Sequence, residues 1–341
     1  MENAGSSKKV YLFPYQKLLT WFKKSARDLP WRHEYDPYQI ALSEFMLQQT
    51  QIKTALPYFE NWVKKWPKWE NLAKAKEEDV LKAWQGLGYY NRAKRLHQLS
   101  KSVHYDHKDQ LPNDLELLKQ CPGIGDYTAS AIGSIAFNLP TFPIDGNVRR
   151  VLARFYNNYE KSPSKDQDTF FKTEMEPVFQ KTKKRRELAQ ALMELGALIC
   201  SPQPKCDSCP LKKECIAYKN NTQADLPQKL KKEKSRPYFI YYCWVKTKKG
   251  YLVKQRSEKE RFANFWQPVL IEGEDEEKVK EEFYQLLNKS KIVPLKQHKS
   301  HMTKYKVSWH GFSLNKELKI NHYKTVHEVN QLNFIPKLIL P

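Results

Sequence analysis

Residues 113–137 read NDLELLKQCPGIGDYTASAIGSIAF, and this stretch decides the fold of the first part of the chain. Its apolar spacing predicts one helix that ends near Gln120 and a second helix that begins near Asp126. In the tight turn between them, Gly123 and Gly125 permit backbone conformations and close approaches that other residues resist. The turn also presents unpaired backbone N–H groups at the start of a helix, which suits the binding of an anion.

Two interpretations of this turn are open. It is either an ordinary helix–helix connection with a glycine hinge or a helix–hairpin–helix that holds a DNA phosphate through backbone amides. The chain carries 59 lysines and arginines against 38 aspartates and glutamates, a formal net charge of +21. Charge alone suits a generally basic protein equally well, although phosphate neutralisation supplies most non-specific affinity for nucleic acid. Together the turn and the charge favour the DNA-binding interpretation.

The chain of 341 residues is long enough for two domains. Residues 8–218 show apolar side chains at helical spacing, and we interpret the polar residues 219–236 as a linker. Residues 237–341 are rich in β-forming segments, with predicted strands at 238–245, 251–253 and 304–309 and a predicted helix at 276–287. We therefore expect an α+β protein, an all-α domain followed by a smaller α/β domain.

No run approaches the roughly 18 apolar residues of a membrane span, and the N-terminus lacks the apolar stretch of a secretory signal. We expect a soluble, intracellular protein. In a reducing compartment, cysteines close in sequence indicate metal ligation rather than disulfides, and four cluster here: Cys200, Cys206, Cys209 and Cys215. Structural zinc sites usually combine two short C-x2–4-C pairs, whereas only Cys206 and Cys209 form one, so a [4Fe–4S] cluster is favoured over zinc.

Glu44 lies on a predicted helix, in YQIALSEFMLQQ at 38–49. Its neighbours three and four positions away are nearly all apolar: Ile40, Ala41, Leu47 and Gln48. Desolvation on such a face should raise the pKa of the carboxyl, so that it can remain a proton donor. The alternative, a solvated glutamate on a surface helix, is disfavoured by these neighbours.

Asp145 stands at a predicted helix start, in FPIDGNVRRVL at 142–152, where backbone N–H groups and the helix dipole stabilise an anion. Capping alone would explain it, although capping and an electrostatic role are compatible. One raised acid and one persistent anion are what cleavage of a sugar–base bond requires, since the acid protonates the leaving base and the anion stabilises the oxocarbenium-like sugar. A base inside a duplex must first be extruded.

Six motifs span most of the first domain: LPWR at 29–32, SEFMLQQTQ at 43–51, GLGYYNRAKRLH at 86–97, PGIGDYTASAI at 122–132, FPIDGNVRRVLARF at 142–155 and MELGALIC at 193–200. They resemble the helix–hairpin–helix glycosylase superfamily that includes endonuclease III, and within it the adenine DNA glycosylases of the MutY type. The resemblance implies that Glu44 protonates adenine, that Asp145 is the catalytic aspartate, and that Asn147 helps to hold Asp145 and a bound water.

The same resemblance assigns further residues. Tyr127 occupies the position at which bifunctional relatives carry a Schiff-base lysine, and a phenol cannot form an imine, so a monofunctional glycosylase is implied. Trp31 and Arg32 match the wall of the adenine pocket. A strip that wedges into the duplex and contacts the opposing base is matched by Leu47, Gln48, Gln49, Thr50, Leu87, Gly88 and Tyr89. Cys121 replaces the usual leucine before the turn, and the first cysteine gap is one residue shorter than is common in the family.

The second domain resembles the Nudix-like domain with which this family recognises 8-oxoguanine opposite adenine. It has no Nudix hydrolase signature, so binding rather than hydrolysis is implied. Ser300 and His301 stand where the family has Phe-Ser-His, but Lys299 replaces the aromatic residue. His301 either donates to the lesion or faces solvent on a hairpin, and the sequence leaves both possibilities open.

The leading hypothesis is a monofunctional, monomeric adenine glycosylase that acts on double-stranded DNA with adenine opposite 8-oxoguanine or guanine. A second hypothesis is an endonuclease III-like glycosylase and lyase for damaged pyrimidines, which Tyr127 and the second domain disfavour. A third is a non-catalytic, cluster-bearing DNA-binding or redox-sensing protein. The combination of Glu44, Asp145 and Asn147 disfavours it, because binding alone does not require an acid and an anion.

Overall fold

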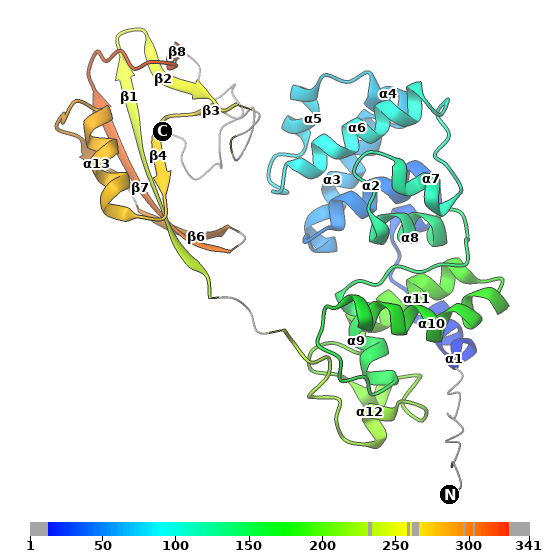
Figure 1. The fold of residues 1–341 in the computed structure, drawn as a ribbon. Helices are drawn as coiled ribbons and strands as arrows, with labels where there is room; N and C mark the ends of the chain where they lie inside the picture. Colours follow the sequence, from blue (N-terminus) through cyan, green and yellow to red (C-terminus); the bar gives the residue numbers. More distant parts are fainter. Residues whose placement is uncertain are drawn as a thin grey trace, which may run out of the picture. The chain divides into compact units, whose positions relative to one another are not determined.

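The computed structural model describes residues 13–230, 234–257, 260, 266–295, 297–302 and 304–326. The chain forms two compact units, Met1–Leu230 and Lys231–Pro341, and each is described by itself (Figure 1). The outer ends of the two predicted domains, residues 8–12 and 327–341, lie outside the described residues.

The first unit is built from helices, as the spacing of its apolar residues predicts. In chain order these are α1 (Tyr15–Ser25), the short η1 (Pro30–Arg32), α2 (Pro37–Leu47), α3 (Ile52–Lys65), α4 (Trp69–Ala73), α5 (Glu77–Ala83), α6 (Asn91–Tyr105), α7 (Leu115–Gln120), α8 (Asp126–Ile135), α9 (Gly146–Phe155), α10 (Lys165–Lys181), α11 (Arg185–Leu198), η2 (Cys206–Ser208) and α12 (Ile216–Lys219).

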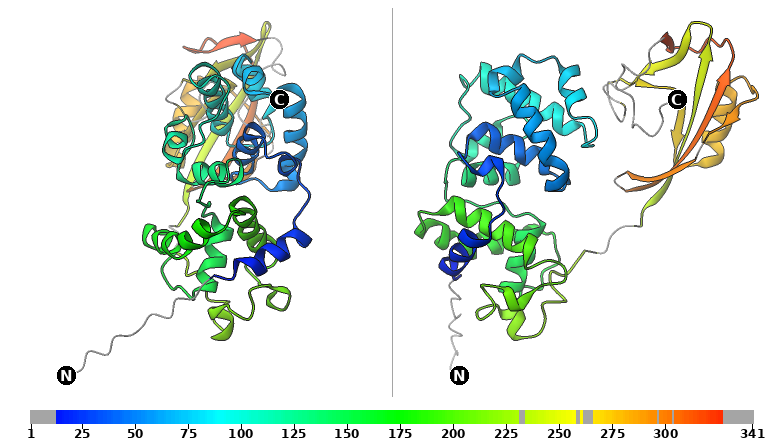
Figure 2. Two further views of the ribbon diagram at one scale, coloured as in Figure 1. Left: turned by 90° about the vertical axis from the view of Figure 1, so that its right-hand side faces the viewer. Right: turned by 180° about the vertical axis from the view of Figure 1, so that it is seen from behind.

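These helices form two lobes, each around its own apolar core. One core gathers buried side chains from residues 29–136 and includes Trp62 and Trp84. The other combines α1 with α9, α10 and α11, so the chain begins in this lobe, crosses to the first and returns (Figure 2). A surface where the two lobes meet can therefore take side chains from segments far apart in the sequence.

Side-chain caps fix where several of these helices begin. Asp36 accepts a hydrogen bond from Gln39 N at the start of α2, and Asp114 accepts from Glu116 N and Leu117 N at the start of α7. Each cap satisfies backbone N–H groups that have no partner within the helix. Asp145 caps α9 in the same way, which places its carboxylate at the junction between the lobes.

The predicted linker, 219–236, is wrong over its first part. Leu226 is buried in the first unit, and its carbonyl oxygen accepts from Arg154 Nε at 2.9 Å. The backbone of Ser162 is hydrogen-bonded with Gln228 and Leu230 at 2.7 and 3.2 Å. The contacts use mainly backbone atoms, which composition does not reveal, so a polar segment read as a linker is in fact anchored up to residue 230.

The second unit consists of β-strands around one helix. Its elements are β1 (Arg236–Thr247), β2 (Gly250–Gln255), β3 (Trp266–Gln267), β4 (Val269–Gly273), α13 (Glu276–Leu286), β5 (Val293–Pro294), β6 (His298–Met302), β7 (Tyr305–Asn315) and β8 (Lys324–Val326). The segments predicted as strands and as a helix are confirmed.

The long strands β1 and β7 run parallel, with Arg236 opposite Tyr305 and Lys246 opposite Asn315. Antiparallel β2 and β4 extend the sheet from β1, and antiparallel β5 and β6 pair with β7. The helix α13 covers one face, where Phe283 packs in the core (Figure 1). Within the part of the chain that is described, no helix combines the length and the apolar character that crossing a membrane requires.

Candidate active site

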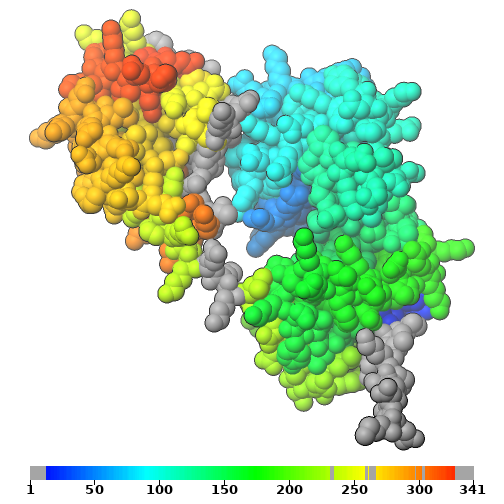
Figure 3. Space-filling view, viewed as in Figure 1, coloured from blue at the N-terminus to red at the C-terminus, as the bar shows by residue number. Residues whose placement is uncertain are grey.

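A cavity of about 510 Å³ lies where the two lobes of the helical unit meet. Glu44 on α2 and Tyr127 on α8 line it from one lobe, and Asp145, Asn147 and Glu194 line it from the other. In the space-filling view, blue atoms of the segment around α3 lie between the cyan and the green parts of this unit (Figure 3). The two carboxyl groups that the sequence singles out, Glu44 and Asp145, therefore share one cavity.

Glu44 is held in a nearly dry environment. The residue is only 6% exposed, and burial raises the pKa of its carboxyl to about 7. A hydrogen bond from Tyr127 Oη to Glu44 Oε2, at 3.1 Å, and the charge of Arg32 act against this rise, while the nearby Asp145 adds to it. Near neutral pH a substantial fraction of Glu44 therefore carries a proton, as its apolar neighbours predict.

Asp145 is surrounded by donors. Its two carboxylate oxygens accept from Val148 N at 2.7 Å and from Asn147 Nδ2 at 2.9 Å. The start of α9 also points the positive end of a helix dipole at this side chain. The side chain thus both caps the helix and faces the cavity, which makes the two roles considered from sequence compatible in space.

The support of Asp145 continues towards the cysteine loop. Arg150 Nη2 donates to Asn147 Oδ1 at 2.9 Å, and Arg150 Nε donates to the carbonyl oxygen of Cys200 at 2.6 Å. Close packing of α9 and α11 makes this possible, because a Cβ atom at Gly196 would lie 2.6 Å from Asn147 Cβ. Arg150 therefore links the side chain of Asn147 to the backbone of Cys200, the first of the four clustered cysteines.

Tyr127 stands directly beside Glu44. Burial, together with the Glu44 and Asp145 charges, keeps the pKa of its phenol well above the usual range, so the hydroxyl stays protonated and donates to the carboxyl. The cavity thus contains a neutral phenol at the position where the resemblance implies a lysine in bifunctional relatives.

The opposite wall holds a buried ion-pair cluster that sequence reasoning missed in part. Glu194 on α11 is completely buried and binds both Arg27, at 2.9 Å, and Arg32, at 2.7 Å. Trp31, predicted with Arg32 as part of the pocket wall, is buried beside it and packs edge-on against Phe59. Glu194 lies in the quoted motif MELGALIC on an otherwise apolar helix face, the same signal that singled out Glu44.

The residues of the predicted strip lie at the end of α2, on the loop that follows it and on the loop before α6. Leu47 and Thr50 line the cavity, and Gln49 and Tyr89 both adopt positive φ, 58° and 48°. One buried residue, Arg92, joins the loops, since its guanidinium donates to the carbonyl oxygens of Phe45, Met46, Gln48, Leu87 and Gly88 and to Thr50 Oγ1. Arg92 lies in the motif GLGYYNRAKRLH, but no local pattern indicates this role, because it depends on contacts distant in sequence.

The glycine turn between α7 and α8 has the expected form. Gly123 has φ +77°, and a Cβ atom there would lie 2.7 Å from Arg95 Cβ and 3.3 Å from the Phe45 ring. Gly125 precedes α8, and a Cβ atom there would meet nothing within 4 Å. Gly123 is thus required by the fold, whereas Gly125 leaves the start of α8 open for another molecule. Cys121 is buried, as expected for a small core residue.

The four clustered cysteines converge on a second, small cavity of the helical unit. It is lined by Cys200, Cys206, Cys209 and Cys215, together with Arg154 and Lys212. Arg154 Nη1 lies 3.4 Å from Cys200 Sγ. Within the described ranges, no three or more histidine, cysteine, aspartate or glutamate side chains are placed to hold one metal ion. The cysteines therefore surround a common space without closing around a single point.

Ser300 and His301 lie on β6 of the second unit. Ser300 Oγ accepts from the indole N–H of Trp309 at 2.8 Å, and both Lys299 and His301 are exposed. They are remote in sequence from the cavity residues and belong to a separate unit, so their part in the site stays a prediction.

Comparison with known proteins places this geometry in a family. Residues 42–177 match the model of the HhH-GPD superfamily base excision DNA repair proteins. The adenine DNA glycosylase of Buchnera aphidicola subsp. Schizaphis graminum is 33% identical over 309 residues, which cover 89% of this chain and 85% of the relative. The adenine DNA glycosylase of Mycobacterium tuberculosis is 41% identical over 198 residues, 57% of this chain and 64% of the relative.

Among solved structures, a thermostable thymine-DNA glycosylase superposes with a TM-score of 0.55 at 27% identity, covering 60% of this chain and 95% of that one. The superfamily match falls on the helical unit, and the similarity to the Buchnera protein extends over most of the chain. The chain therefore belongs to the adenine DNA glycosylase family, base excision repair enzymes that hydrolyse an N-glycosidic bond.

Proposed function

We propose that this protein is a monofunctional glycosylase that excises adenine paired with 8-oxoguanine or guanine in double-stranded DNA. The observation that carries the proposal is the single cavity shared by Glu44 and Asp145, an acid with a pKa of about 7 and a carboxylate held by two N–H donors. Its volume of about 510 Å³ is in the range of small-molecule sites and would admit one extruded base.

The chemistry divides between the two carboxyl groups. Glu44 gives its proton to a ring nitrogen of adenine, which turns the base into a neutral leaving group as the C1′–N9 bond breaks. Asp145 stabilises the positive charge that develops on the sugar, either electrostatically or by a transient bond to C1′. Water then adds to C1′, and its proton passes to a carboxylate. Asn147 holds Asp145 in place throughout.

Tyr127 supports the monofunctional assignment. A lyase step requires an amine that attacks C1′ and forms an imine, and a protonated phenol cannot do so. The endonuclease III-like alternative, a glycosylase and lyase for damaged pyrimidines, would need another amine in the cavity. Lys53 also lines it and is the group to exclude by mutation if strand cleavage is found.

The buried ion-pair cluster suits recognition of the base. Adenine presents both an exocyclic amino donor and ring-nitrogen acceptors, and the wall formed by Arg27, Arg32 and Glu194 offers charged donors beside a carboxylate acceptor. Trp31 supplies an apolar surface next to them. We assign this wall to adenine binding.

The Arg92-braced loops and the glycine turn are assigned to DNA. One guanidinium, that of Arg92, joins the two loops by six hydrogen bonds, and such a braced pair of loops is suited to entering a duplex where a base has left. The open start of α8 at Gly125 is suited to a phosphate. The net charge of +21 supplies the long-range attraction.

We assign the cysteine loop to a [4Fe–4S] cluster. The lining fits such a group, because four thiol side chains from one short segment surround a single cavity, and their spacing contains only one short C-x2-C pair. When bound, the cluster would join residues 200–215 by metal–thiolate bonds and so order a basic loop. Iron and sulfide content together with broad visible absorbance test this, and a colourless, zinc-containing preparation made anaerobically would contradict it.

The sheet-containing unit is proposed to be the Nudix-like part that reads 8-oxoguanine. Ser300 supports this, because its oxygen accepts from the Trp309 N–H, and among the described residues its own hydroxyl has no acceptor and can donate to a ligand. Exposed His301 is the second candidate donor, and Lys299 offers charge in place of an aromatic surface. The protein is proposed to work as an intracellular monomer. Of the rest of the predicted linker, residues 231–233 lie outside the described residues, and Arg236 is the first residue of β1.

Base release from a panel of duplexes tests the function. Adenine opposite 8-oxoguanine or guanine should be released with the backbone left intact until alkali cleaves the abasic site. Release of oxidised pyrimidines with direct strand scission would favour the lyase alternative, and DNA binding without base release would favour a non-catalytic role.

A further inference from the structure

A lysine lies at the rim of the catalytic cavity, and the excision chemistry does not use it. Lys53 lines the cavity together with Glu44 and Asp145, yet Lys53 is exposed whereas Glu44 is buried. It is the second residue of α3, directly after the loop that follows α2. A side chain that lines a cavity and is also exposed can contact a ligand at the point where the ligand enters.

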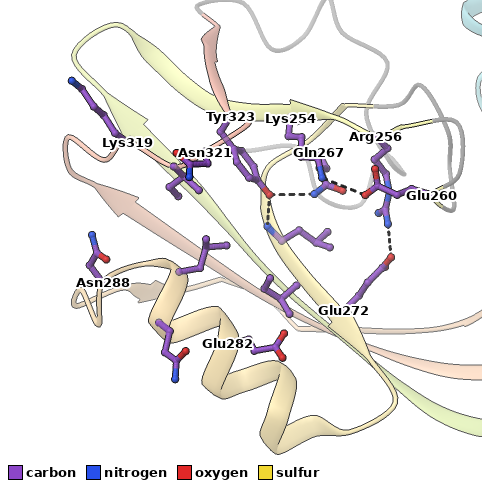
Figure 4. A pocket seen from close by; sticks show the side chains of 15 residues that line it. Lys254, Arg256, Glu260, Gln267, Glu272, Glu282, Asn288, Lys319, Asn321 and Tyr323 are labelled. Carbon is purple, nitrogen blue, oxygen red and sulfur yellow. Dashed lines mark hydrogen bonds and ion pairs between the residues drawn. The ribbon is translucent and has the colours of Figure 1, made fainter.

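Several other cations that line cavities of this protein are matched by carboxylates. The sheet-containing unit has a cavity of about 640 Å³, in which Arg256 pairs with Glu272 (Figure 4). Lys254 in the same cavity pairs with Glu260 at 3.4 Å. In the catalytic cavity, the two arginines of the wall assigned to adenine share one glutamate. Lys53 differs, because no carboxylate of the described residues forms an ion pair with it.

The position of Lys53 is unfavourable for the stability of α3. The start of a helix is the positive end of its dipole, where a cation is repelled. The first turn of α3 contains no acidic residue that could offset the lysine. At the other end of the helix, Lys64 and Lys65 suit the negative end of the dipole. A charge that lowers the stability of the free protein and has no partner within it indicates an anion that arrives with the substrate.

An extruded nucleotide carries such an anion. In the proposed mechanism the base lies against the wall assigned to adenine, and the sugar lies between Glu44 and Asp145. The sugar is joined to phosphates through O3′ and O5′, and the strand must pass the rim of the cavity on its way back to the duplex. A lysine ammonium is a compact cation on a flexible stem, which suits contact with a phosphate oxygen at this rim.

We propose that Lys53 binds a backbone phosphate next to the extruded adenosine and so positions the nucleotide in the cavity. This role rests on the proposed excision of adenine and adds a positioning residue to it. Because the contact forms only after extrusion, Lys53 favours the mispaired duplex over a fully paired one. A lysine that merely adds to the basic surface would act on both duplexes alike.

Duplex binding tests the proposal in Glu44→Gln, which retains the base during the measurement. Adding Lys53→Ala should weaken binding of the A:8-oxoguanine duplex several-fold. It should also make the slope of log K against log salt concentration less steep by about 0.9, the value of one phosphate contact. Binding of a fully paired duplex should change little. The free protein should unfold at a higher temperature, because a cation leaves the helix start, whereas loss of a merely structural lysine would lower that temperature.

Neutral phosphates locate the contact. A methylphosphonate at one of the two phosphates that flank the adenosine should weaken binding by Glu44→Gln as much as Lys53→Ala does. The two changes together should give no further loss, because both remove the same ion pair. Lys64→Ala is the matched control on the same helix, exposed and outside the cavity lining, and should leave binding unchanged.

Three results would overturn the proposal. Lys53→Ala could bind the mispaired duplex as tightly as its parent, it could weaken both duplexes equally, or its effect could add to that of a methylphosphonate at each flanking position. Adenine release by the unmodified chain is measured separately. Absence of that release refutes the excision itself, whereas the three results refute only the contact of Lys53.

Discussion

Two buried glutamates face the same cavity from opposite walls, and their surroundings differ. Glu44 is hydrogen-bonded by a neutral phenol, and burial raises its pKa to about 7. Glu194 is even more deeply buried, yet it binds two guanidinium groups, those of Arg27 and Arg32. One side chain type therefore serves two purposes, a proton donor on one wall and a paired charge on the other, and the neighbours alone decide which.

The largest expected effect is a loss of the rate of adenine release when Glu44 is replaced. Glu44→Gln keeps the size of the side chain but cannot supply a proton, so adenine release under single-turnover conditions should fall about 10²–10⁴-fold. Affinity for the duplex should stay close to that of the unmodified chain, and the free energy of unfolding should differ only in its dependence on pH. Glu60→Gln, on the exposed side of α3, is the matched control. A variant that releases adenine at the original rate would remove Glu44 as the acid.

Glu194→Gln should instead mainly lower the free energy of unfolding. It leaves Arg27 and Arg32 without their counter-charge, and loss of one partner from a buried ion pair costs about 3 kcal/mol. Urea unfolding should show this loss, and adenine release should fall as well because the recognition wall is disturbed. Glu187→Gln on the same helix serves as control. If Glu194→Gln lowered the rate but left stability unchanged, the distinction between the two walls would fail.

The titration of Glu44 should make the free energy of unfolding depend on pH. The pKa of Glu44 is about 7 in the folded state and near 4.5 when unfolded, so the folded state binds its proton more tightly. The resulting stabilisation is fully present below pH 4.5 and is lost as pH rises through 7, with a total of about 3 kcal/mol. The difference in unfolding free energy between the unmodified chain and Glu44→Gln should follow this curve. A difference that is flat from pH 4 to 8 contradicts the assignment.

The smallest effect is expected at Tyr127. Its hydrogen bond lowers the pKa of Glu44, so Tyr127→Phe should raise that pKa and extend activity to higher pH. One hydrogen bond is worth about 1 kcal/mol, or about a five-fold change in rate on the alkaline side. The pH profile of single-turnover adenine release measures it. A shift towards lower pH would mean that the phenol acts on Glu44 in another way.

Sequence determined a large part of this picture because several signals are local. The glycine turn at Gly123, the apolar face around Glu44 and the helix start at Asp145 each depend on neighbours within a few residues, since helical spacing and capping act over one turn. The alternating burial of β7 was likewise visible in its residue types. The motifs that resemble the adenine DNA glycosylases extended these local signals to an expected activity.

Tertiary structure decided the rest. It brings Glu44 and Asp145 into one cavity, pairs Glu194 with Arg27 across 167 positions, and lets Arg92 brace two loops from the centre. It also shows residues 220–230 anchored through backbone atoms where composition suggested a linker. Such contacts depend on how two apolar cores pack against each other, and packing joins residues whose separation in the chain carries no local pattern.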